Sequence, residues 1–298
     1  MAGVIELGYL GLNVTDLDAW RSYATECVGF EIVESGKDDN FHLRMDLQHH
    51  RFTVHKSDED DMAYMGWRVA GQEEFKAMQK TLTDAGVEYR VGSQEEASER
   101  HVLAILKLED PSGTATEIYY SPQVDVIKPF HPGRPMYGKF VAGDQGIGHV
   151  LVRSDDDEKT YEFYKLLGLE GSIEYRIPMP DGNFAEPIFM SCNARQHSIA
   201  FGFHGMKERL NHLHIQYTDF DDMGQSHDII RKKGIDVAMQ LGKHSNDQLY
   251  TFYSATPSGW LMELGWGDYV KTGAQEHYAG DIFGHGVEAS GYGMDIEL

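Results

Sequence analysis

Chemically capable residues are concentrated in one short stretch, residues 244–267, which contains His244, Asp247, Tyr253 and Glu263. Residues 248–254 and 260–265 read as two strands joined by a tight turn, so the stretch predicts a hairpin. Glu263 has apolar neighbours on both sides in this hairpin. Burying a carboxylate is costly unless it is paired or binds a metal. The alternative is that Glu263 points outward to solvent, as glutamates usually do.

Two histidines further back favour the metal interpretation. His149 and His212 each lie in a predicted strand, and each is followed seven residues later by an aspartate near a helix start. Two neutral imidazoles and one carboxylate form the facial triad that suits non-haem Fe(II) and leaves positions open for other ligands. A single strand histidine is more often a packing residue. The prediction that His149, His212 and Glu263 bind a metal therefore depends on their matching positions in a repeated fold.

His214 complicates this assignment. It lies two residues after His212, so both side chains face the same side of a strand. His214 is either a pocket residue or the true ligand in place of His212. The seven-residue offset to Asp219 favours His212.

The elements that must position these residues recur four times along the chain. Each unit reads as one strand, one helix and a run of strands, with helices expected over 17–27, 73–85, 155–167 and 221–233. The turn Pro-Ser-Gly occurs at 111–113, before Glu117, and again at 257–259, before Glu263. The chain therefore predicts an α+β fold of four βαβββ modules, whose strands curl into cups with the helices outside.

A proline-rich segment, residues 121–146, separates the second module from the third. We place a domain boundary there, with an N-terminal domain at 1–130 and a C-terminal domain at 131–298. The N-terminal counterparts of the three candidate ligands are Tyr9, Trp67 and Glu117. Since this set contains no imidazole, the metal site is expected in the C-terminal domain alone.

The charge and composition of the chain argue against several classes of binding partner. The formal net charge of -22 argues against binding to nucleic acids or anionic membranes. No run of 18 apolar residues predicts a membrane span, and no signal peptide is evident. The two cysteines, Cys27 and Cys192, lie far apart, which fits a reducing cytoplasmic location.

Several longer motifs carry a family resemblance: GDQGIGHVLVR (143–153), CNARQHSIAF (192–201), KERLNHLHIQYTDFDDMG (207–224) and LGKHSNDQLYTFYSATPSGWLMELGWG (241–267). With these motifs the chain resembles the type I extradiol ring-cleaving dioxygenases of the vicinal-oxygen-chelate superfamily, along nearly its whole length. It is most similar to the members that act on bicyclic catechols such as 1,2-dihydroxynaphthalene and 2,3-dihydroxybiphenyl.

The resemblance implies roles by position. It implies Fe(II) as cofactor, a catechol and O₂ as substrates, and a homo-oligomer, often an octamer. His197 looks like the second-sphere histidine beside the O₂ site, and His244 and Tyr253 look like hydrogen-bonding partners of the diol. The expected substrate contacts also include Asn246, Asp247, Phe189 and the ligand His212. Two departures from the family pattern, Asn211 and His214, leave the fine substrate preference open.

Other functions share the fold, so the fold alone does not choose among them. A monocyclic catechol 2,3-dioxygenase is the nearest alternative, followed by metal-dependent isomerases such as glyoxalase and by non-catalytic antibiotic-binding proteins. Four side chains, Phe189, Met190, Phe201 and Phe203, are candidates for an apolar pocket that would hold a second ring. The tail, residues 272–298, either covers the pocket mouth or is a solvated extension.

Overall fold

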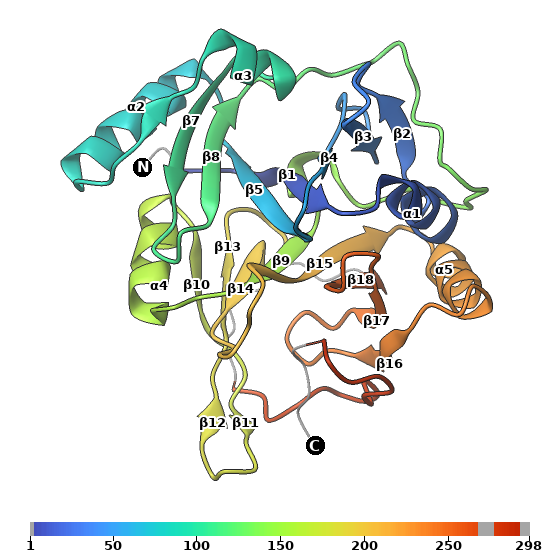
Figure 1. Cartoon of the computed structure of the whole chain (residues 1–298). Coiled ribbons are helices and arrows are strands. Elements are labelled where there is room, and N and C mark those ends of the chain that lie inside the picture. Colours follow the sequence, from blue (N-terminus) through green and yellow to red (C-terminus); the bar gives the residue numbers. More distant parts are fainter. Residues whose placement is uncertain (1–2, 268–276, 293–298) are drawn as a thin grey trace.

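The computed structural model describes residues 3–267 and 277–292 and contains two eight-stranded sheets plus a separate two-stranded hairpin. The first sheet occupies the upper half of Figure 1 and the second the lower half, with helices on the outside of both. The strand order is β2-β3-β4-β1-β5-β8-β7-β6 in the first sheet and β10-β13-β14-β9-β15-β18-β17-β16 in the second. The two orders match position by position, which confirms the α+β fold with its repeated modules.

The first sheet is built from two modules. The first module comprises β1 (Glu6–Val14), α1 (Leu17–Ser22) running on as the π-helix η1 (Tyr23–Val28), β2 (Glu31–Glu34), β3 (Asn40–Arg44) and β4 (Phe52–Lys56). The second comprises β5 (Asp61–Arg68), α2 (Gln72–Asp84), β6 (Arg90–Val91), α3 (Gln94–Glu99), β7 (Ala104–Glu109) and β8 (Ala115–Tyr120). Their first strands, β1 and β5, pair antiparallel and join the modules.

The second sheet repeats this plan after the short 3-10 turn η2 (Gly143–Gln145). The third module comprises β9 (His149–Val152), α4 (Asp157–Leu166), β10 (Glu170–Ile173), the hairpin β11 (Ile177–Pro178) and β12 (Phe184–Ala185), β13 (Ile188–Ser191) and β14 (Ile199–Phe201). The fourth comprises β15 (Leu210–Tyr217), α5 (Phe220–Lys232), β16 (Val237–Lys243), β17 (Tyr250–Ala255) and β18 (Leu261–Trp266). The sequence patterns did not predict β6, α3, β16 or the β11–β12 hairpin, which projects from the bottom of the molecule (Figure 1).

Helix boundaries follow local chemistry. Asp16, Asp156 and Asp219 are N-caps, each accepting a hydrogen bond from a backbone N–H of the first turn. The aspartate found seven residues after each key strand position therefore starts the helix, because a carboxylate satisfies an N–H that has no partner within the helix. Gly29 follows η1 with φ of +102°, a conformation that glycine adopts without steric cost.

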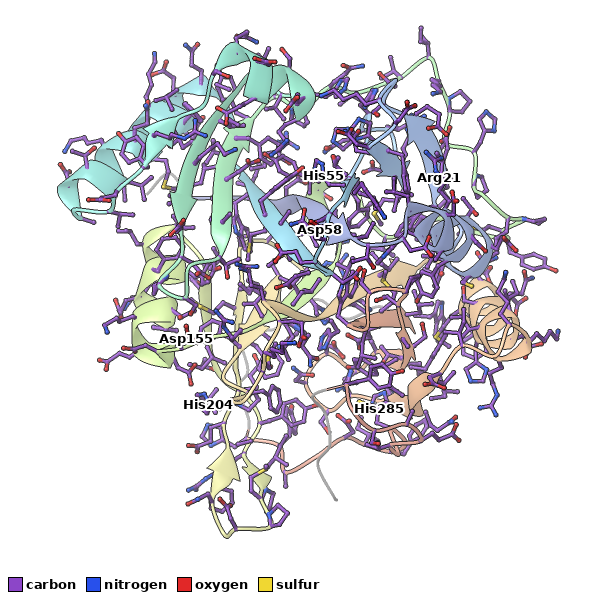
Figure 2. The ribbon with its side chains drawn as sticks, viewed as in Figure 1. Arg21, His55, Asp58, Asp155, His204 and His285 are labelled. Atoms are coloured by element: carbon purple, nitrogen blue, oxygen red, sulfur yellow. The ribbon has the colours of Figure 1, made fainter. Side chains whose placement is uncertain are left out.

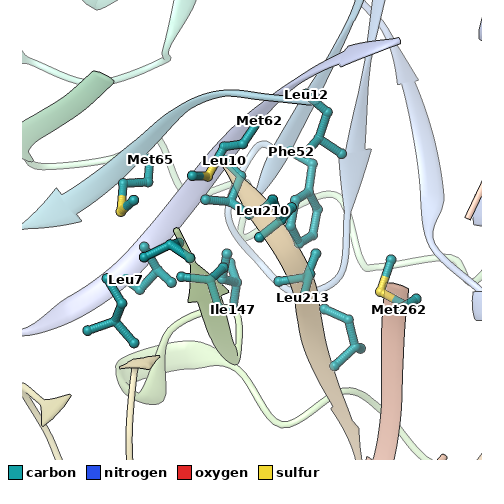
Figure 3. Packing of buried hydrophobic residues seen from close by; sticks show 14 of the residues in the cluster. Leu7, Leu10, Leu12, Phe52, Met62, Met65, Ile147, Leu210, Leu213 and Met262 are labelled. Atoms are coloured by element: carbon teal, nitrogen blue, oxygen red, sulfur yellow. The ribbon is translucent and has the colours of Figure 1, made fainter. Parts of the chain in front are cut away.

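One continuous hydrophobic core links the two sheets. Figure 3 shows Leu10 and Phe52 from the first sheet packed close to Leu210 and Leu213 from the second. Polar contacts also cross between the halves, including the bond from Trp20 Nε1 to Ser258 Oγ at 2.8 Å. The sheets are thus fixed relative to each other. The boundary expected at residue 130 lies between β8 and β9 and stays a prediction.

None of the helices in the described ranges has the length and apolar character needed to cross a membrane.

Candidate metal centre and substrate pocket

The three candidate ligands come together on adjacent strands of the second sheet. His149 lies on β9, His212 on β15 and Glu263 on β18, and all three side chains are buried. Glu263 Oε2 is 2.9 Å from His149 Nε2 and 3.5 Å from His212 Nε2. One ligand atom from each residue lies within 4.8 Å of the others. The repeat-based prediction therefore identified three side chains that converge on one point.

The surroundings of these residues fit a divalent metal. Burial by itself would raise the pKa of Glu263, but the facing imidazoles of His214 and His149 hold it well below its usual value, so the carboxylate is charged. Asn211 Nδ2 donates to the backbone of the tail, so its Oδ1 is the atom that faces His212 Nδ1 at 3.0 Å. That oxygen can only accept, which places the proton on Nδ1 and leaves the Nε2 lone pair for a metal.

His214 does not belong to the converging group. It is fully buried on β15 and stacks against His149 with ring centroids 4.5 Å apart. Neither of its ring nitrogens has a hydrogen-bond partner within the described ranges. His214 lies level with His149 and Glu263 on the neighbouring strands but does not line the pocket, so His212 is the better candidate of the two.

A pocket opens beside this group, and two of its three members, His149 and His212, line it. It is lined by His149, Leu151, Tyr175, Ile177, Pro187, Phe189, His197, Ala200, Phe203, His212, Met239, His244, Asn246, Asp247, Tyr253, Gly280, Asp281, His285 and Val287. Every non-ligand residue predicted from the family resemblance is in this set. The lining combines apolar side chains with polar ones. The pocket can therefore hold an aromatic ring system and still present hydrogen-bonding groups to its hydroxyls.

Of the four apolar residues predicted to line the pocket, two do so and two do not. Phe189 and Phe203 line the pocket, but Met190 and Phe201 are fully buried in the core on the other side of the sheet. Successive residues of a strand point to opposite faces, so Phe189, which pairs with Ala200, faces the pocket. Its neighbour Met190 must face the core.

His197 lies beside the candidate ligands, with its ring 3.8 Å from that of His149. Gln196 Nε2 donates to Glu174, so Gln196 Oε1 accepts a hydrogen bond from His197 Nδ1. Burial lowers the pKa of His197 well below its usual value. The imidazole is therefore neutral, with its lone pair on Nε2.

His244 and Tyr253 lie on the polar side of the pocket. His244 Nε2 is 2.9 Å from both Tyr253 Oη and Glu263 Oε1. Burial would lower the pKa of His244, but the charge of Asp247 and hydrogen bonds to Asp281 and Glu263 raise it well above its usual value. The pair thus presents two hydrogen-bonding groups next to the candidate metal ligands.

Asn246 and Asp247 form the turn that carries these groups. Asn246 Oδ1 accepts a bond from Asp247 N at 2.8 Å, and Asp247 Oδ1 accepts one from Leu249 N at 3.0 Å. Burial raises the pKa of Asp247. The buried Nδ2 of Asn246 has no hydrogen-bond partner among residues 3–267 and 277–292. A donor of this kind, in a pocket wall, is available to a ligand.

The tail supplies two residues that sequence reasoning missed. Asp281 Oδ1 accepts a hydrogen bond from His244 Nδ1 at 3.0 Å, and Asp281 Oδ2 accepts one from His285 Nδ1 at 2.7 Å. Backbone bridges also join the tail to β16, and Figure 2 shows His285 low in the molecule beside this strand. The described part of the tail, residues 277–292, therefore covers the pocket. Residues 272–276 and 293–298 lie outside the described ranges.

The first sheet has no imidazole at the corresponding positions. Tyr9 Oη donates to Glu117 Oε2 at 2.6 Å, in the arrangement that His149 and Glu263 have in the second sheet. The predicted third counterpart is wrong, because strand register matches His212 with Tyr64, three residues before Trp67. Tyr64 lies seven residues before Gly71, the N-cap of α2, as His212 lies seven residues before Asp219. Because Gly71 is not an aspartate, the sequence lacks the marker that would have shown this offset.

Comparisons with known proteins agree with this geometry. Residues 7–56 match the family model described as Dihydroxybiphenyl dioxygenase BphC D1, and residues 146–264 match the Glyoxalase/Bleomycin resistance protein/Dioxygenase superfamily. The chain is 60% identical to the biphenyl-2,3-diol 1,2-dioxygenase of Sphingomonas paucimobilis, and 58% identical to the 1,2-dihydroxynaphthalene dioxygenase of Sphingobium xenophagum. Both alignments cover 100% of each chain.

A solved structure described as catechol 2,3-dioxygenase superposes with a TM-score of 0.98 at 54% identity, covering 100% of this chain and 99% of that one. The repeated modules, the converging His-His-Glu group and the full-length similarity lead to one conclusion. The chain belongs to the extradiol ring-cleaving dioxygenases of the glyoxalase/bleomycin resistance/dioxygenase superfamily.

Proposed function

We propose that this enzyme uses Fe(II) and O₂ to cleave bicyclic catechols such as 1,2-dihydroxynaphthalene or 2,3-dihydroxybiphenyl at the ring bond next to the diol. Both oxygen atoms of O₂ enter the product, and one carbon–carbon bond is broken. The observation that carries the proposal is the convergence of His149, His212 and Glu263 beside a pocket that is partly lined by apolar side chains. Full-length relatives named for these two substrates support it.

The cofactor, when bound by these three residues, orients the diol and O₂ and makes the diol more acidic. The protein's own groups then handle protons and position. His244 Nε2 and Tyr253 Oη lie 2.9 Å apart and can hydrogen-bond to the diol oxygens. The free amide donor of Asn246 adds a further contact. Neutral His197 lines the pocket with its ring 3.8 Å from that of His149 and can accept a proton and later return it.

The apolar part of the pocket lining favours a second ring. It includes Phe189, Ile177, Pro187 and Phe203. An additional aromatic ring buries roughly 100 Å², worth about 2–3 kcal/mol at 25 cal/mol per Å². Specificity for bicyclic diols should therefore exceed that for catechol by about tens-fold.

A monocyclic substrate is the second candidate, because the structural relative described as catechol 2,3-dioxygenase is 54% identical. The test is to load metal-free enzyme anaerobically with Fe(II) or Mn(II). Oxygen uptake and ring-fission product are then measured for 1,2-dihydroxynaphthalene, 2,3-dihydroxybiphenyl and catechol. Equal kcat/KM for catechol would refute the bicyclic preference. Activity of the Mn(II)-loaded enzyme together with inactivity of the Fe(II)-loaded enzyme would refute Fe(II) as the cofactor. The octamer implied by family resemblance also stays a prediction, which light scattering can check.

A further inference from the structure

Four histidines gather at one place in the first sheet, away from the site described above. His42 comes from β3, His49 and His50 from the β3–β4 turn, and His101 from the turn before β7. The rings of His42 and His50 stack at 4.2 Å, and those of His49 and His101 at 3.6 Å. One nitrogen from each of His42, His50 and His101 lies within 4.8 Å of the others.

A hydrogen bond at the edge of this cluster fixes the position of the proton on one of its three rings. Gln123 Nε2 donates to Asp125 at 2.8 Å, so Gln123 Oε1 is the atom that faces His101 Nδ1 at 2.9 Å. A carbonyl oxygen only accepts, so His101 carries its proton on Nδ1 and its lone pair on Nε2. The hydroxyl of Thr53, 3.1 Å from His42 Nδ1, can accept in the same way. Metal-binding histidines usually have such a partner on the second nitrogen.

The cluster occupies the counterpart of the substrate pocket. Strand pairing puts His42 in the first sheet where Phe189 lies in the second. His42 pairs with Thr53 on β4, as Phe189 pairs with Ala200 on β14. His50 and His197 each lie three residues before the partner in that pair. In the first sheet an imidazole, that of His42, therefore stands where the second sheet has the aromatic ring of Phe189. His50 stands where the second sheet has His197.

The carboxylate at the base of this cup already has charged partners without a metal. Glu117, the counterpart of Glu263, accepts a hydrogen bond from Tyr9 and forms ion pairs with Arg100 and Lys107 at 3.0 and 3.2 Å. The charge of Arg100 is thus offset by Glu117. A narrow crevice without room for a free water molecule is lined by Tyr9, His49, His50, Arg100 and His101, among others.

From this geometry we propose that His42, His50 and His101 form a second metal site that binds a zinc-type cation, namely Zn²⁺, Ni²⁺ or Cu²⁺. Imidazole nitrogens suit these cations, whereas calcium and magnesium require oxygen ligands. Three histidines around zinc leave a fourth tetrahedral position for a further ligand.

Binding requires a small closing movement. Nitrogens bound to one zinc at about 2.0–2.1 Å lie roughly 3.4 Å from each other, and those of the cluster lie within 4.8 Å. His42 and His50 are buried, but His101 is only partly buried and lies on a turn. Its backbone φ of +53° is unusual for a residue other than glycine. Rotation of His101 toward the other two rings would complete the site.

The test uses the iron-loaded enzyme, dialysed against a graded series of Zn²⁺ concentrations, with zinc and iron per chain measured by elemental analysis. We expect one zinc per chain with no loss of iron. His42→Ala and His101→Ala should each weaken zinc binding by at least about tenfold, on the scale of losing a metal-site partner. His55→Gln, on the neighbouring strand β4, and His204→Ala, on the surface, are matched controls and should bind zinc normally; both positions are labelled in Figure 2.

Two further measurements keep the proposal falsifiable if a ligand variant misfolds. Gln123→Ala leaves all three ligands in place and should weaken zinc binding by about 10- to 100-fold. X-ray absorption at the zinc edge should show imidazole nitrogens at about 2.0–2.1 Å. The proposal is overturned if wild type takes up no zinc, if zinc enters only as iron leaves, or if the ligand variants bind zinc as tightly as the controls.

Discussion

His244 and Asp281 lie 37 residues apart and are joined by a hydrogen bond of 3.0 Å from His244 Nδ1 to Asp281 Oδ1. The carboxylate also accepts bonds from His285 and from Tyr175 Oη at 2.9 Å. The tail thereby fixes the ring that faces the candidate metal ligands. Asp281 acts through His244, which makes it a positioning residue.

Replacing Asp281 by Ala should therefore reduce kcat/KM for a bicyclic diol by about tenfold to a hundredfold, because a small misplacement of a functional group is costly. Asp281→Asn retains an oxygen that accepts from His244 and should lose less. Steady-state kinetics on both variants, with circular dichroism to check folding, makes the comparison. Unchanged kinetics in Asp281→Ala would show that the tail does not position His244.

The two glutamates at equivalent positions give a paired test of the metal site. Glu263→Ala should abolish iron retention and ring cleavage, because it removes one of three ligands. Glu117→Ala should keep iron and activity. It should nevertheless lower the free energy of unfolding by about 3–5 kcal/mol, since the buried Arg100 loses its ion-pair partner. Iron content, oxygen uptake and denaturant titration separate the two effects. Stoichiometric iron in Glu263→Ala would refute the ligand assignment.

The sequence predicts the candidate ligands His149, His212 and Glu263 because the same strand positions recur in each repeated module. Residues at the same offset from a helix start therefore occupy equivalent places in the fold. It could not predict the tail contacts. Asp281 and His285 lie in an irregular segment without hydrophobic periodicity, so nothing in their spacing indicates where they pack. The histidine cluster was missed for a related reason: His42, His50 and His101 meet only through strand pairing and a turn.

His197 should matter more for turnover than for binding the diol. It contacts Gln196 and the ring of His149, whereas His244 and Tyr253 carry the polar contacts expected for the diol. An interaction needed only after substrate binding lowers kcat and leaves affinity unchanged. His197→Phe should turn over about a hundredfold more slowly and bind the diol anaerobically as wild type does. A collapse of diol affinity with fast single-turnover oxygen chemistry would contradict this role.

His55 should contribute to acid sensitivity of the fold. Burial, and then the nearby charge of Arg100, lower the pKa of His55 below its usual value. The unfolded chain binds a proton at this residue below about pH 6.5, and the folded chain binds it only at lower pH. The stabilising contribution is therefore complete above that pH and is lost as pH falls toward the folded pKa.

His55→Gln removes this titration and can keep the hydrogen bond that His55 Nε2 makes with Tyr64 Oη at 3.1 Å. Denaturant titrations of wild type and variant at pH 7.5 and pH 5.5 would measure the effect. Wild type should lose more stability than the variant between the two values. Equal losses would show that His55 does not titrate differently in the two states.

His214 provides the last prediction, because its burial and its chemistry disagree. The side chain is fully buried, stacks on His149, and has no hydrogen-bond partner for either ring nitrogen in the described chain. Leaving a buried polar group unpaired costs about 1–3 kcal/mol. His214→Leu replaces the ring with an apolar side chain of similar size. It should leave the free energy of unfolding unchanged or raise it, and should retain iron and ring cleavage. His212→Leu, two residues away on the same strand, is the matched control and should lose both. Iron loss in His214→Leu together with iron retention in His212→Leu would mean that His214 is the ligand, because only a coordinating imidazole explains that reversal.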